Sequence, residues 1–354
     1  MKHYVGLDVS LKETSICIVN SEGNIVYQGQ ETTNPSKIAK HLRGINLSLE
    51  KVAIESGSLS HWLICGLQEL RIPAICVDAR HISSVLSMKI NKTDQNDAHG
   101  IADALRCGYY REVSIKPQSL VETGTLLQSR AILVQERTKI KNAIRGLLKS
   151  YGIKISITGK KAFSVRVKEL IQNRVETVKA GIDALLLTFD LLDEQVKKLE
   201  KQIQELAKDN EDVQILTTIP GVGVITALSF LISLGDFRRF EDSRNVGAYM
   251  GLTPRQYSSG DVQRQGKISK CGPRQTRSLL VEAAVVMLTR TRSWNKPKAW
   301  AMKLQKKKGF KKAAVALARK LTVIMHRMLI TREAFRLGDS IEKQEKPVLE
   351  KKTA

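Results

Sequence analysis

The residues HYVGLDVS, numbers 3–10, alternate between apolar side chains and others. Side chains of a β-strand point to opposite faces in turn, so Val5, Leu7 and Val9 share one face and Asp8 lies on the other. Residues 15–20 and 24–30 continue with strand-forming composition after short polar turns. Residues 4–30 are therefore predicted to form a meander of three strands.

Helix and strand patterns alternate over the next part of the chain. Residues 35–47 and 59–70 have helical periodicity, and residues 52–55 and 74–77 read as short buried strands. The order βββαβαβα predicts a mixed sheet with helices on its faces. We therefore expect residues 1–115 to form a first domain of the α/β class.

After Pro117 the periodicity becomes purely helical. One predicted helix repeats apolar residues every seven positions, and a second has an a/d heptad seam longer than three heptads. The seam consists of Ile182, Leu185, Phe189, Leu192, Val196, Leu199, Ile203 and Leu206. Because it is narrow and flanked by Glu, Gln and Lys, it slightly favours pairing with a second chain; the alternative is a helical hairpin within one chain. Residues 116–210 are thus predicted to be a helical coiled-coil region.

The remainder of the chain is basic. Residues 211–335 are predicted to form a mainly helical domain that ends in the lysine clusters 306–308 and 311–312, beside Arg319 and Lys320. The polar residues 336–354 are predicted to be a disordered tail.

Net charge indicates the class of partner. The 354 residues include 58 Lys and Arg against 35 Asp and Glu, a formal charge of +23, which implies a polyanion such as DNA or RNA. No apolar run reaches about 18 residues and the strand pattern at the start leaves no room for a signal peptide, so we expect a soluble, cytoplasmic, nucleoid-associated protein without a membrane partner.

Cysteine and histidine contribute no recognisable site. The five cysteines are scattered, mostly within apolar segments, which predicts buried free thiols. There is no CxxC pair, and no histidine has ligand spacing with a cysteine, so a structural zinc site is not expected.

Four carboxylates are candidates for metal binding. Asp8 lies in the first strand, Glu55 ends a later strand, and Asp94 and Asp97 stand three apart at the start of a helix, on one face. If they converge they repel one another unless cations neutralise them, and oxygen ligands select Mg²⁺ or Mn²⁺. Two such ions could bridge a scissile phosphate. Taken singly, Asp94 can be a helix N-terminal charge and Glu55 a solvated strand end.

Residues 216–227, LTTIPGVGVITA, match a helix-hairpin-helix pattern with Gly221 and Gly223 in the hairpin. Glycines let backbone N–H groups reach a phosphate, and the N-terminus of the following helix adds positive potential. Such a contact does not depend on base sequence. The alternative is a plain αα-hairpin.

A serine-containing basic loop follows. Ser258 and Ser259 precede Gly260, and Ser269 lies in GKISK, residues 266–270. Nearby cations lower the cost of an alkoxide and of a pentavalent phosphorus, so these serines are suited to attack a phosphodiester, although Ser-Ser-Gly is by itself usually a turn. The cations expected to bind phosphates are Arg255, Arg264, Lys267, Lys270, Arg274 and Arg277.

The motifs GLDVS (6–10), AIES (53–56) and KTDQNDA (92–98) resemble the Asp-Glu-Asp-Asp set of RuvC-like, ribonuclease-H-fold domains in insertion-sequence transposases of the one-ten family. The Gly-Leu-x-Pro, Ser-Gly and Gly-x-Ile-Ser-Lys elements of residues 251–270 resemble the same family. One departure is Cys271, where a basic residue is commoner.

The resemblance implies a DNA transposase or site-specific recombinase. Within it, Ser259 is assigned as the nucleophile of a covalent phosphoserine link, with Ser258 and Ser269 as substitutes, and Asp8, Glu55, Asp94 and Asp97 are assigned as the Mg²⁺ site. It further implies a structured bridge RNA that pairs with donor and target DNA. Since few residues are aromatic, we expect recognition of the RNA backbone rather than base stacking. Joining two duplexes requires an even-numbered oligomer, a dimer or tetramer.

Two other functions are compatible with these residues. The first is a metal-dependent junction-resolving nuclease that uses water and needs no serine. The second is a catalytically silent nucleic-acid-binding protein that uses only the hairpin motif and the basic helices.

Overall fold

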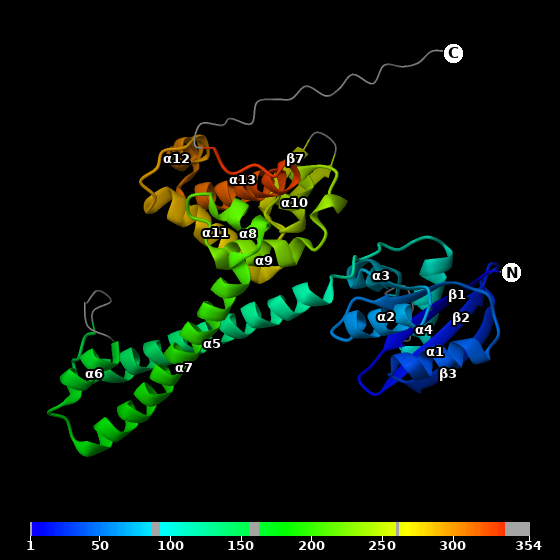
Figure 1. Cartoon of the computed structure of the whole chain (residues 1–354), viewed down its shortest axis with the longest axis horizontal. Helices are drawn as coiled ribbons and strands as arrows, with labels where there is room; N and C mark the ends of the chain where they lie inside the picture. Colours follow the sequence, from blue (N-terminus) through cyan, green and yellow to red (C-terminus); the bar gives the residue numbers. More distant parts are fainter. Residues whose placement is uncertain (1, 87–92, 156–162, 260–261, 337–354) are drawn as a thin grey trace, which may run out of the picture. The chain divides into compact units, whose positions relative to one another are not determined.

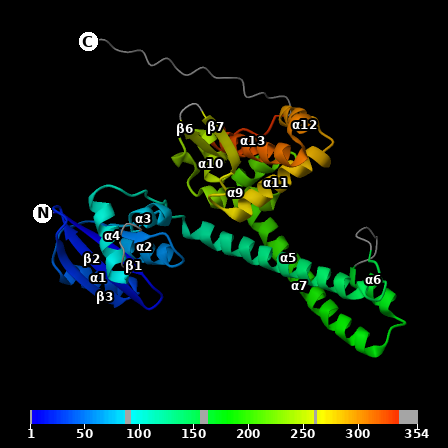
Figure 2. The same cartoon turned by 180° about the vertical axis from the view of Figure 1, so that it is seen from behind.

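The computed structural model describes residues 2–86, 93–155, 163–259 and 262–336. The chain divides into two compact units, residues 1–117 and 118–354 (Figures 1 and 2). The finer domain boundaries expected from the sequence stay a prediction. Residues 337–354 of the expected tail lie outside the described residues.

The first unit contains a five-stranded mixed sheet. Its strands are β1 (His3–Val9), β2 (Glu13–Asn20), β3 (Ile25–Thr32), β4 (Leu49–Glu55) and β5 (Ala74–Val77), in the order β3-β2-β1-β4-β5. Strands β1 to β3 are antiparallel neighbours, whereas β4 runs parallel to β1 and β5 parallel to β4. The predicted meander and mixed sheet are confirmed, and β1 lies at the centre.

Helices cover the two faces of this sheet. On one face Val5 and Leu7 belong to the same buried cluster as residues of α1 (Pro35–Gly44) and α2 (Ser60–Glu69). On the other face Tyr4 and Ala53 pack with residues of α4 (Asp94–Arg106), which α3 (Ala79–Leu86) precedes. The alternation of residues 3–10 therefore separates the faces as the sequence predicts, and the face opposite Val5 and Leu7 is the one that α4 covers.

Gly6 lets α4 approach the central strand closely. A Cβ atom at Gly6 would lie 2.1 Å from the carbonyl oxygen of Ala98 and 2.5 Å from the nitrogen of Ala102. These are backbone atoms, which cannot rotate away. The helix therefore rests on β1 with no side chain between the two backbones.

In the second unit two long helices, α5 (Gln118–Lys149) and α7 (Glu176–Lys208), pack side by side, and the short α6 (Phe163–Ile171) packs against them (Figure 1). Ion pairs join the two long helices: Arg130 Nε lies 2.9 Å from Glu200 Oε1, and Arg137 Nη1 lies 2.5 Å from Asp193 Oδ1. The arrangement is the intramolecular hairpin that the sequence left as the alternative.

The heptad seam of α7 is only partly used by this hairpin. Every seventh residue is buried, namely Ile182, Phe189, Val196 and Ile203. The other seam positions, Leu185, Leu192 and Leu199, are half-buried, and Leu206 is 55% exposed. Pairing of a second chain with this surface stays a prediction.

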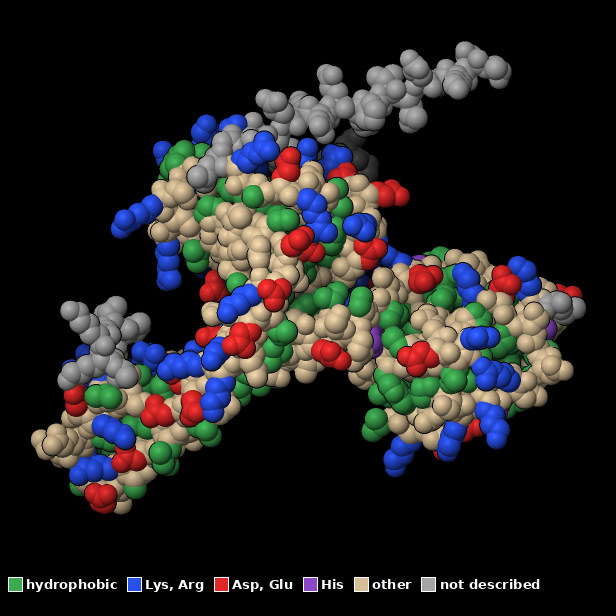
Figure 3. All heavy atoms as spheres, in the orientation of Figure 1, with side chains coloured by type: hydrophobic (Ala, Val, Ile, Leu, Met, Phe, Trp, Pro, Cys, Tyr) green, Lys and Arg blue, Asp and Glu red, His purple; other side chains and the backbone are tan. Residues whose placement is uncertain are grey.

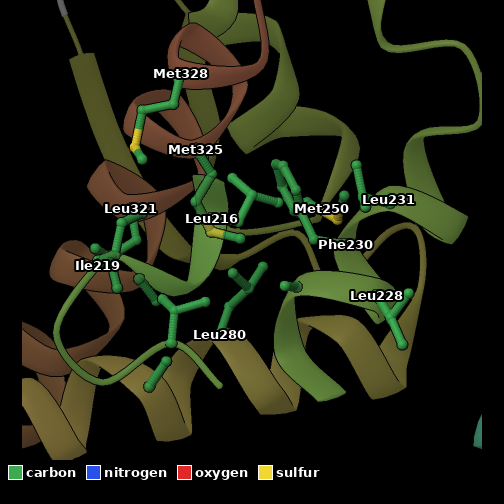
Figure 4. Packing of buried hydrophobic residues seen from close by; sticks show 14 of the residues in the cluster. Leu216, Ile219, Leu228, Phe230, Leu231, Met250, Leu280, Leu321, Met325 and Met328 are labelled. Carbon is green, nitrogen blue, oxygen red and sulfur yellow. The ribbon is translucent and has the colours of Figure 1, made fainter. Parts of the chain in front are cut away.

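The rest of the second unit is mainly helical, as expected. It comprises α8 (Glu211–Thr217), α9 (Val224–Leu234), the 3₁₀ turn η1 (Phe237–Arg239), α10 (Ser243–Tyr249), β6 (Pro254–Ser259), β7 (Val262–Ile268), α11 (Arg274–Thr289), α12 (Lys296–Lys308) and α13 (Phe310–Thr331). Figure 4 shows Leu216, Phe230 and Met325 among the residues of its core. The antiparallel pair β6–β7 replaces the expected basic loop. The sequence did not reveal it because its residues are polar and mostly exposed.

The expectations for cysteines and membranes have separate outcomes. None of the five cysteines, all of which the structure describes, forms a disulfide bond. Cys17 and Cys76 are buried and burial raises the pKa of the Cys76 thiol, but Cys107 and Cys271 are exposed. The expectation of buried thiols is therefore wrong for these last two, which lie at a helix end and in a turn. No helix in the described ranges is long and apolar enough to cross a membrane.

The packing at Gly6 yields a stability prediction. In Gly6→Ala the new methyl group collides with the α4 backbone, so we expect the protection of β1 amides against hydrogen exchange to fall by about 1–3 kcal/mol. Mass spectrometry of β1 peptides measures it. The control is Gly44→Ala at the end of α1, where a Cβ meets nothing within 4 Å. Equal β1 protection in both variants would contradict the prediction.

Candidate active site

Asp8 and Glu55 lie on neighbouring strands. In the parallel pair β1–β4, Leu7 is opposite Ile54, so Asp8 and Glu55 are the next residue on each strand. Glu55 follows the alternation from Ala53, which packs on the α4 side, and both acids are half-buried. Adjacent strands lie about 4.8 Å apart, so the backbone brings the two carboxylates to one place at the edge of the α4 face.

Helix α4 brings Asp94 and Asp97 to the same end of the sheet. Gly6 meets Ala98 and Ala102, while Tyr4 packs against the cluster formed by the second half of the helix. The first turn of α4 therefore lies toward Asp8. Thr93 caps this turn, its Oγ1 accepting from the N–H of Asn96 at 3.2 Å. Asp97 is half-buried and Asp94 is exposed.

The four acids suit a hard divalent cation by their chemistry. All are carboxylates, the oxygen donors that Mg²⁺ and Mn²⁺ prefer, and the start of a helix favours the negative charge of two of them. In the described ranges, however, no three His, Cys, Asp or Glu side chains are placed so that they could hold one ion. The backbone thus brings the acids toward one end of the sheet, but their side chains as placed do not form a ligand set. Lys92 of the same motif lies outside the described residues.

A fifth carboxylate, which the sequence analysis missed, occupies this edge. Asp78 directly follows Val77, the residue of β5 that pairs with Glu55. Burial acts to raise the pKa of Asp78, but hydrogen bonds from the Arg80 side chain and backbone outweigh it and lower the pKa. Asp78 Oδ2 lies 3.1 Å from Arg80 Nη2. The sequence did contain a signal for Asp78, because this acid directly follows the predicted strand 74–77. Its ion pair with Arg80 indicates a structural role.

The two glycines of the hairpin motif have different surroundings. Gly221 has φ +94°, and a Cβ there would lie 2.7 Å from the carbonyl oxygen of Ala283 on α11. Gly223 is exposed, meets nothing within 4 Å, and precedes α9 without a side-chain cap. Close packing therefore explains Gly221, and only Gly223 lies where an N-terminal helix amide could face a phosphate. The pair α8 and α9 also fits the plain αα-hairpin.

Ser259 ends β6 and its side chain is exposed. Alternation along β6 puts Tyr257 and Ser259 on one face. The register of β6 and β7 shifts between Pro254 and Gln256, but a Cβ at Gly266 would lie near both the Tyr257 ring and the Arg255 Cβ, so Arg255 is on the same side. Tyr257 pairs with Arg264 of β7, so Arg264 shares that face. A Cβ at Gly266 would lie 3.2 Å from the Tyr257 ring, so this ring packs closely over the glycine. Ser259 thus shares a strand face with Arg255 and Arg264, and the Nη2 of Arg255 donates to the carbonyl of Ser269 at 3.4 Å.

Tyr257 is a residue of this face that the sequence analysis gave no role. Its side chain is 59% exposed and lies one alternation step from Ser259. A phenol can donate a hydrogen bond to a phosphate oxygen. The signal in the sequence was the two-residue spacing of Arg255, Tyr257 and Ser259. It could be used only once these residues were known to form a strand.

The other serines are less well placed or not described. Ser269 is half-buried and its Oγ accepts from the N–H of Cys271 at 3.4 Å. The side chain of Ser258 and all of Gly260 lie outside the described part. The assignment of Ser259 stays a prediction.

Five of the six predicted phosphate-binding cations are exposed: Arg255, Arg264, Lys267, Lys270 and Arg274. Arg277 differs, because it is half-buried and its Nη1 donates to the carbonyl of Met250 at 3.2 Å. A second carbonyl, that of Cys271, lies 3.5 Å from the same nitrogen. Arg277 therefore stabilises the turns that carry the β6–β7 hairpin.

Two glycines allow those turns to pack closely against each other. A Cβ at Gly251, with φ +68°, would lie 2.1 Å from the carbonyl oxygen of Cys271. A Cβ at Gly272, with φ +92°, would lie 2.1 Å from the carbonyl oxygen of Tyr249. Left-handed backbone and direct contact both favour glycine here. The hairpin with Ser259 is thus held on α10 and α11 by backbone against backbone.

Two family models match the chain. The model described as "Transposase IS116/IS110/IS902 family" matches residues 213–299, which include the β6–β7 hairpin. A model described as a transposase and named for the DEDD group of IS110 matches residues 5–153, which include all four acids.

Several known proteins are similar over most of their length. The transposase for insertion sequence element IS1111A of Coxiella burnetii is 32% identical over 341 residues, 94% of this chain and 91% of the relative. The transposase for insertion sequence element IS1328 of Yersinia enterocolitica is 31% identical over 244 residues, 68% of this chain and 71% of the relative. The pilin gene-inverting protein of Moraxella bovis is 25% identical over 348 residues, 93% of this chain and 96% of the relative. The chain belongs to the IS116/IS110/IS902 transposase family.

Proposed function

We propose that this chain cleaves and rejoins DNA through a covalent link to Ser259, assisted by a divalent ion at Asp8, Glu55, Asp94 and Asp97. The observation that carries the proposal is the strand face shared by Ser259, Arg255 and Arg264. A serine hydroxyl without cations around it is a poor nucleophile, whereas two guanidinium groups offset the charge that develops on phosphorus.

The chemistry is a transesterification. The Ser259 Oγ forms a bond to phosphorus and loses its proton to a base, while the bond from phosphorus to one deoxyribose oxygen breaks. The broken strand end leaves as a hydroxyl, and its attack on the phosphoserine, or that of a second strand end, reverses the step. The number of phosphoester bonds is conserved, so no ATP is required.

The family match implies a divalent metal requirement, and Mg²⁺ or Mn²⁺ is our choice because every proposed ligand is a carboxylate. When bound, the ion polarises the scissile phosphate. Supporting this site, β1, β4 and α4 bring the four acids to one end of the sheet. The meander joined to two parallel strands also agrees with the ribonuclease-H-like, RuvC-like fold that we propose for the first unit.

The partners we propose are donor and target DNA duplexes and a structured guide RNA. The formal charge of +23 supports a polyanionic partner, and the exposed cations of the β6–β7 hairpin supply phosphate contacts. The acids belong to residues 1–117 and Ser259 to residues 118–354. A dimer or tetramer allows both units to serve one strand, within a protomer or between protomers.

The nucleophile can be tested by substitution. With DNA that carries the element's ends, Ser259→Ala should abolish the protein–DNA adduct that survives denaturing electrophoresis, since the attacking oxygen is gone. Ser269→Ala should keep at least half of the adduct. Strand cleavage at an unchanged rate by Ser259→Ala would instead support a water-using nuclease.

The carboxylates can be tested by neutralisation. We expect Asp8→Asn and Glu55→Gln to lower strand cleavage by at least about 100-fold without changing DNA affinity, because they remove metal ligands only. Chelation by EDTA should have the same effect. The matched control is Asp103→Asn, an acid of α4 that is paired with Arg106. Normal recombination by Asp8→Asn would support a non-catalytic binding protein.

Salt dependence can test the phosphate contacts. Arg264→Gln and Lys267→Gln should each reduce the slope of log affinity against log salt by about 1, and weaken binding to unrelated DNA sequences alike. Arg244→Gln serves as control, since Arg244 is exposed but paired with Asp242 at 2.7 Å. A loss limited to one DNA sequence would show that these residues read bases.

A further inference from the structure

A long part of the second unit contains no acidic residue. Between Glu282 and Glu333 there is no Asp or Glu, while residues 290–332 contain 14 Lys and Arg. Figure 3 shows Lys and Arg side chains gathered at the end of this unit where Figure 1 draws α12. In the described ranges, no ion pair involves Lys303, Lys306, Lys307, Lys308, Lys311 or Lys312, and all six are exposed.

The outer face of α12 interleaves cations with an indole. Lys296, Trp300, Lys303 and Lys307 are spaced by four, three and four residues, so they form one stripe. The buried residues of the helix, Pro297, Lys298 and Ala301, lie on another face. Trp300 is 40% exposed. A flat aromatic ring therefore lies between ammonium groups on a solvent-exposed helix face.

Trp300 is held in place from α13. The ammonium of Lys320 lies 4.7 Å from the centre of the Trp300 ring, a cation–π contact, and burial lowers the pKa of this lysine. Because Lys320 contacts one face of the indole, the ring is oriented while part of it stays exposed to solvent.

Trp294 projects from a rigid turn just before α12. The side chain of Trp294 is 64% exposed, yet the next residue, Asn295, is 2% exposed and caps α12 by accepting from the N–H of Lys298 at 2.9 Å. Lys298 is buried, and its Nζ donates to the carbonyl of Thr291 at 2.6 Å. The buried side chains of Asn295 and Lys298 thus hold the turn in place, while the Trp294 indole is exposed to solvent.

We infer that this surface, formed by the Trp294 turn, α12 and the start of α13, binds unpaired nucleotides, with Trp294 and Trp300 stacking on bases and the lysines contacting phosphates. The acid-free cationic surface accounts for a polyanion, but a site for duplex phosphates alone needs no exposed indole. Base–aromatic stacking requires bases that are not paired.

This surface is separate from the proposed site of strand cleavage. Figures 1 and 2 both show α12 and the β6–β7 hairpin on opposite sides of α13. The sequence had led to a different expectation. Because few residues are aromatic, it favoured recognition of the RNA backbone over stacking on bases. Two of the three tryptophans are nevertheless exposed on the acid-free segment.

The test uses the full chain in EDTA, so that its outcome does not depend on Ser259 or on a metal. Labelled 20-nucleotide DNA and RNA single strands of one sequence are compared with the corresponding DNA duplex. Trp294→Ala and Trp300→Ala should each weaken single-strand binding about tenfold and duplex binding by less than about twofold. Trp→Phe at the same positions should restore most of the affinity, since a ring remains.

Trp62 provides the matched control, because it is 48% exposed in the first unit. Trp62→Ala should leave all affinities unchanged. In Trp62→Phe the remaining tryptophan emission comes from Trp294 and Trp300 alone, and single strands should quench it more than duplex does.

Comparison of DNA with RNA identifies the polymer that the site binds. If the alanine variants lose equal affinity for both single strands, the site does not distinguish deoxyribose from ribose. If they lose affinity for only one, that polymer is the ligand. Three results would overturn the inference: affinities within twofold for both alanine variants, equal losses with single strand and duplex, or displacement of the single strand by polyglutamate at the same charge concentration as by unlabelled single strand.

Discussion

The contact on which the first unit depends is the direct approach of the α4 backbone to β1 at Gly6. Any side chain at this position would insert between the central strand and the helix. Its absence places the first turn of α4 at the end of the sheet where Asp8 and Glu55 lie on neighbouring strands. This contact therefore decides which acids of the helix lie toward the acids of the strands.

Close backbone contact at glycine also occurs in the second unit, where it supports the β6–β7 hairpin. Gly251 and Gly272 each place backbone against the carbonyl of the opposite turn, and Arg277 hydrogen-bonds to carbonyls of both. An exposed two-stranded hairpin is marginal by itself, so these contacts to α10 and α11 stabilise the strand that presents Ser259. Arg277, which the sequence suggested as a phosphate contact, therefore takes part in packing these turns.

Positive charge has more than one role in this protein. Some cations are neutralised within the fold, as Arg130 is by Glu200 and Arg137 by Asp193. Others lie on the β6–β7 hairpin beside the proposed nucleophile. The lysines of α12 and the start of α13 form a third group, which has exposed indoles instead of acids around it. The net charge of +23 is the sum of these groups and does not by itself distinguish them.

The sequence alone determined the alternating strand of residues 3–10, the meander, the long helices, the family and the candidate acids, because local periodicity and short motifs are read along one segment. It did not determine the partner of the α7 seam, the strand nature of residues 254–268, or the ion-paired state of Asp78. Each of these depends on which distant residue lies opposite. Trp294 and Trp300 show the same limit: composition counts rings, but only tertiary packing decides which rings remain exposed, because burial depends on neighbours that the local sequence does not specify.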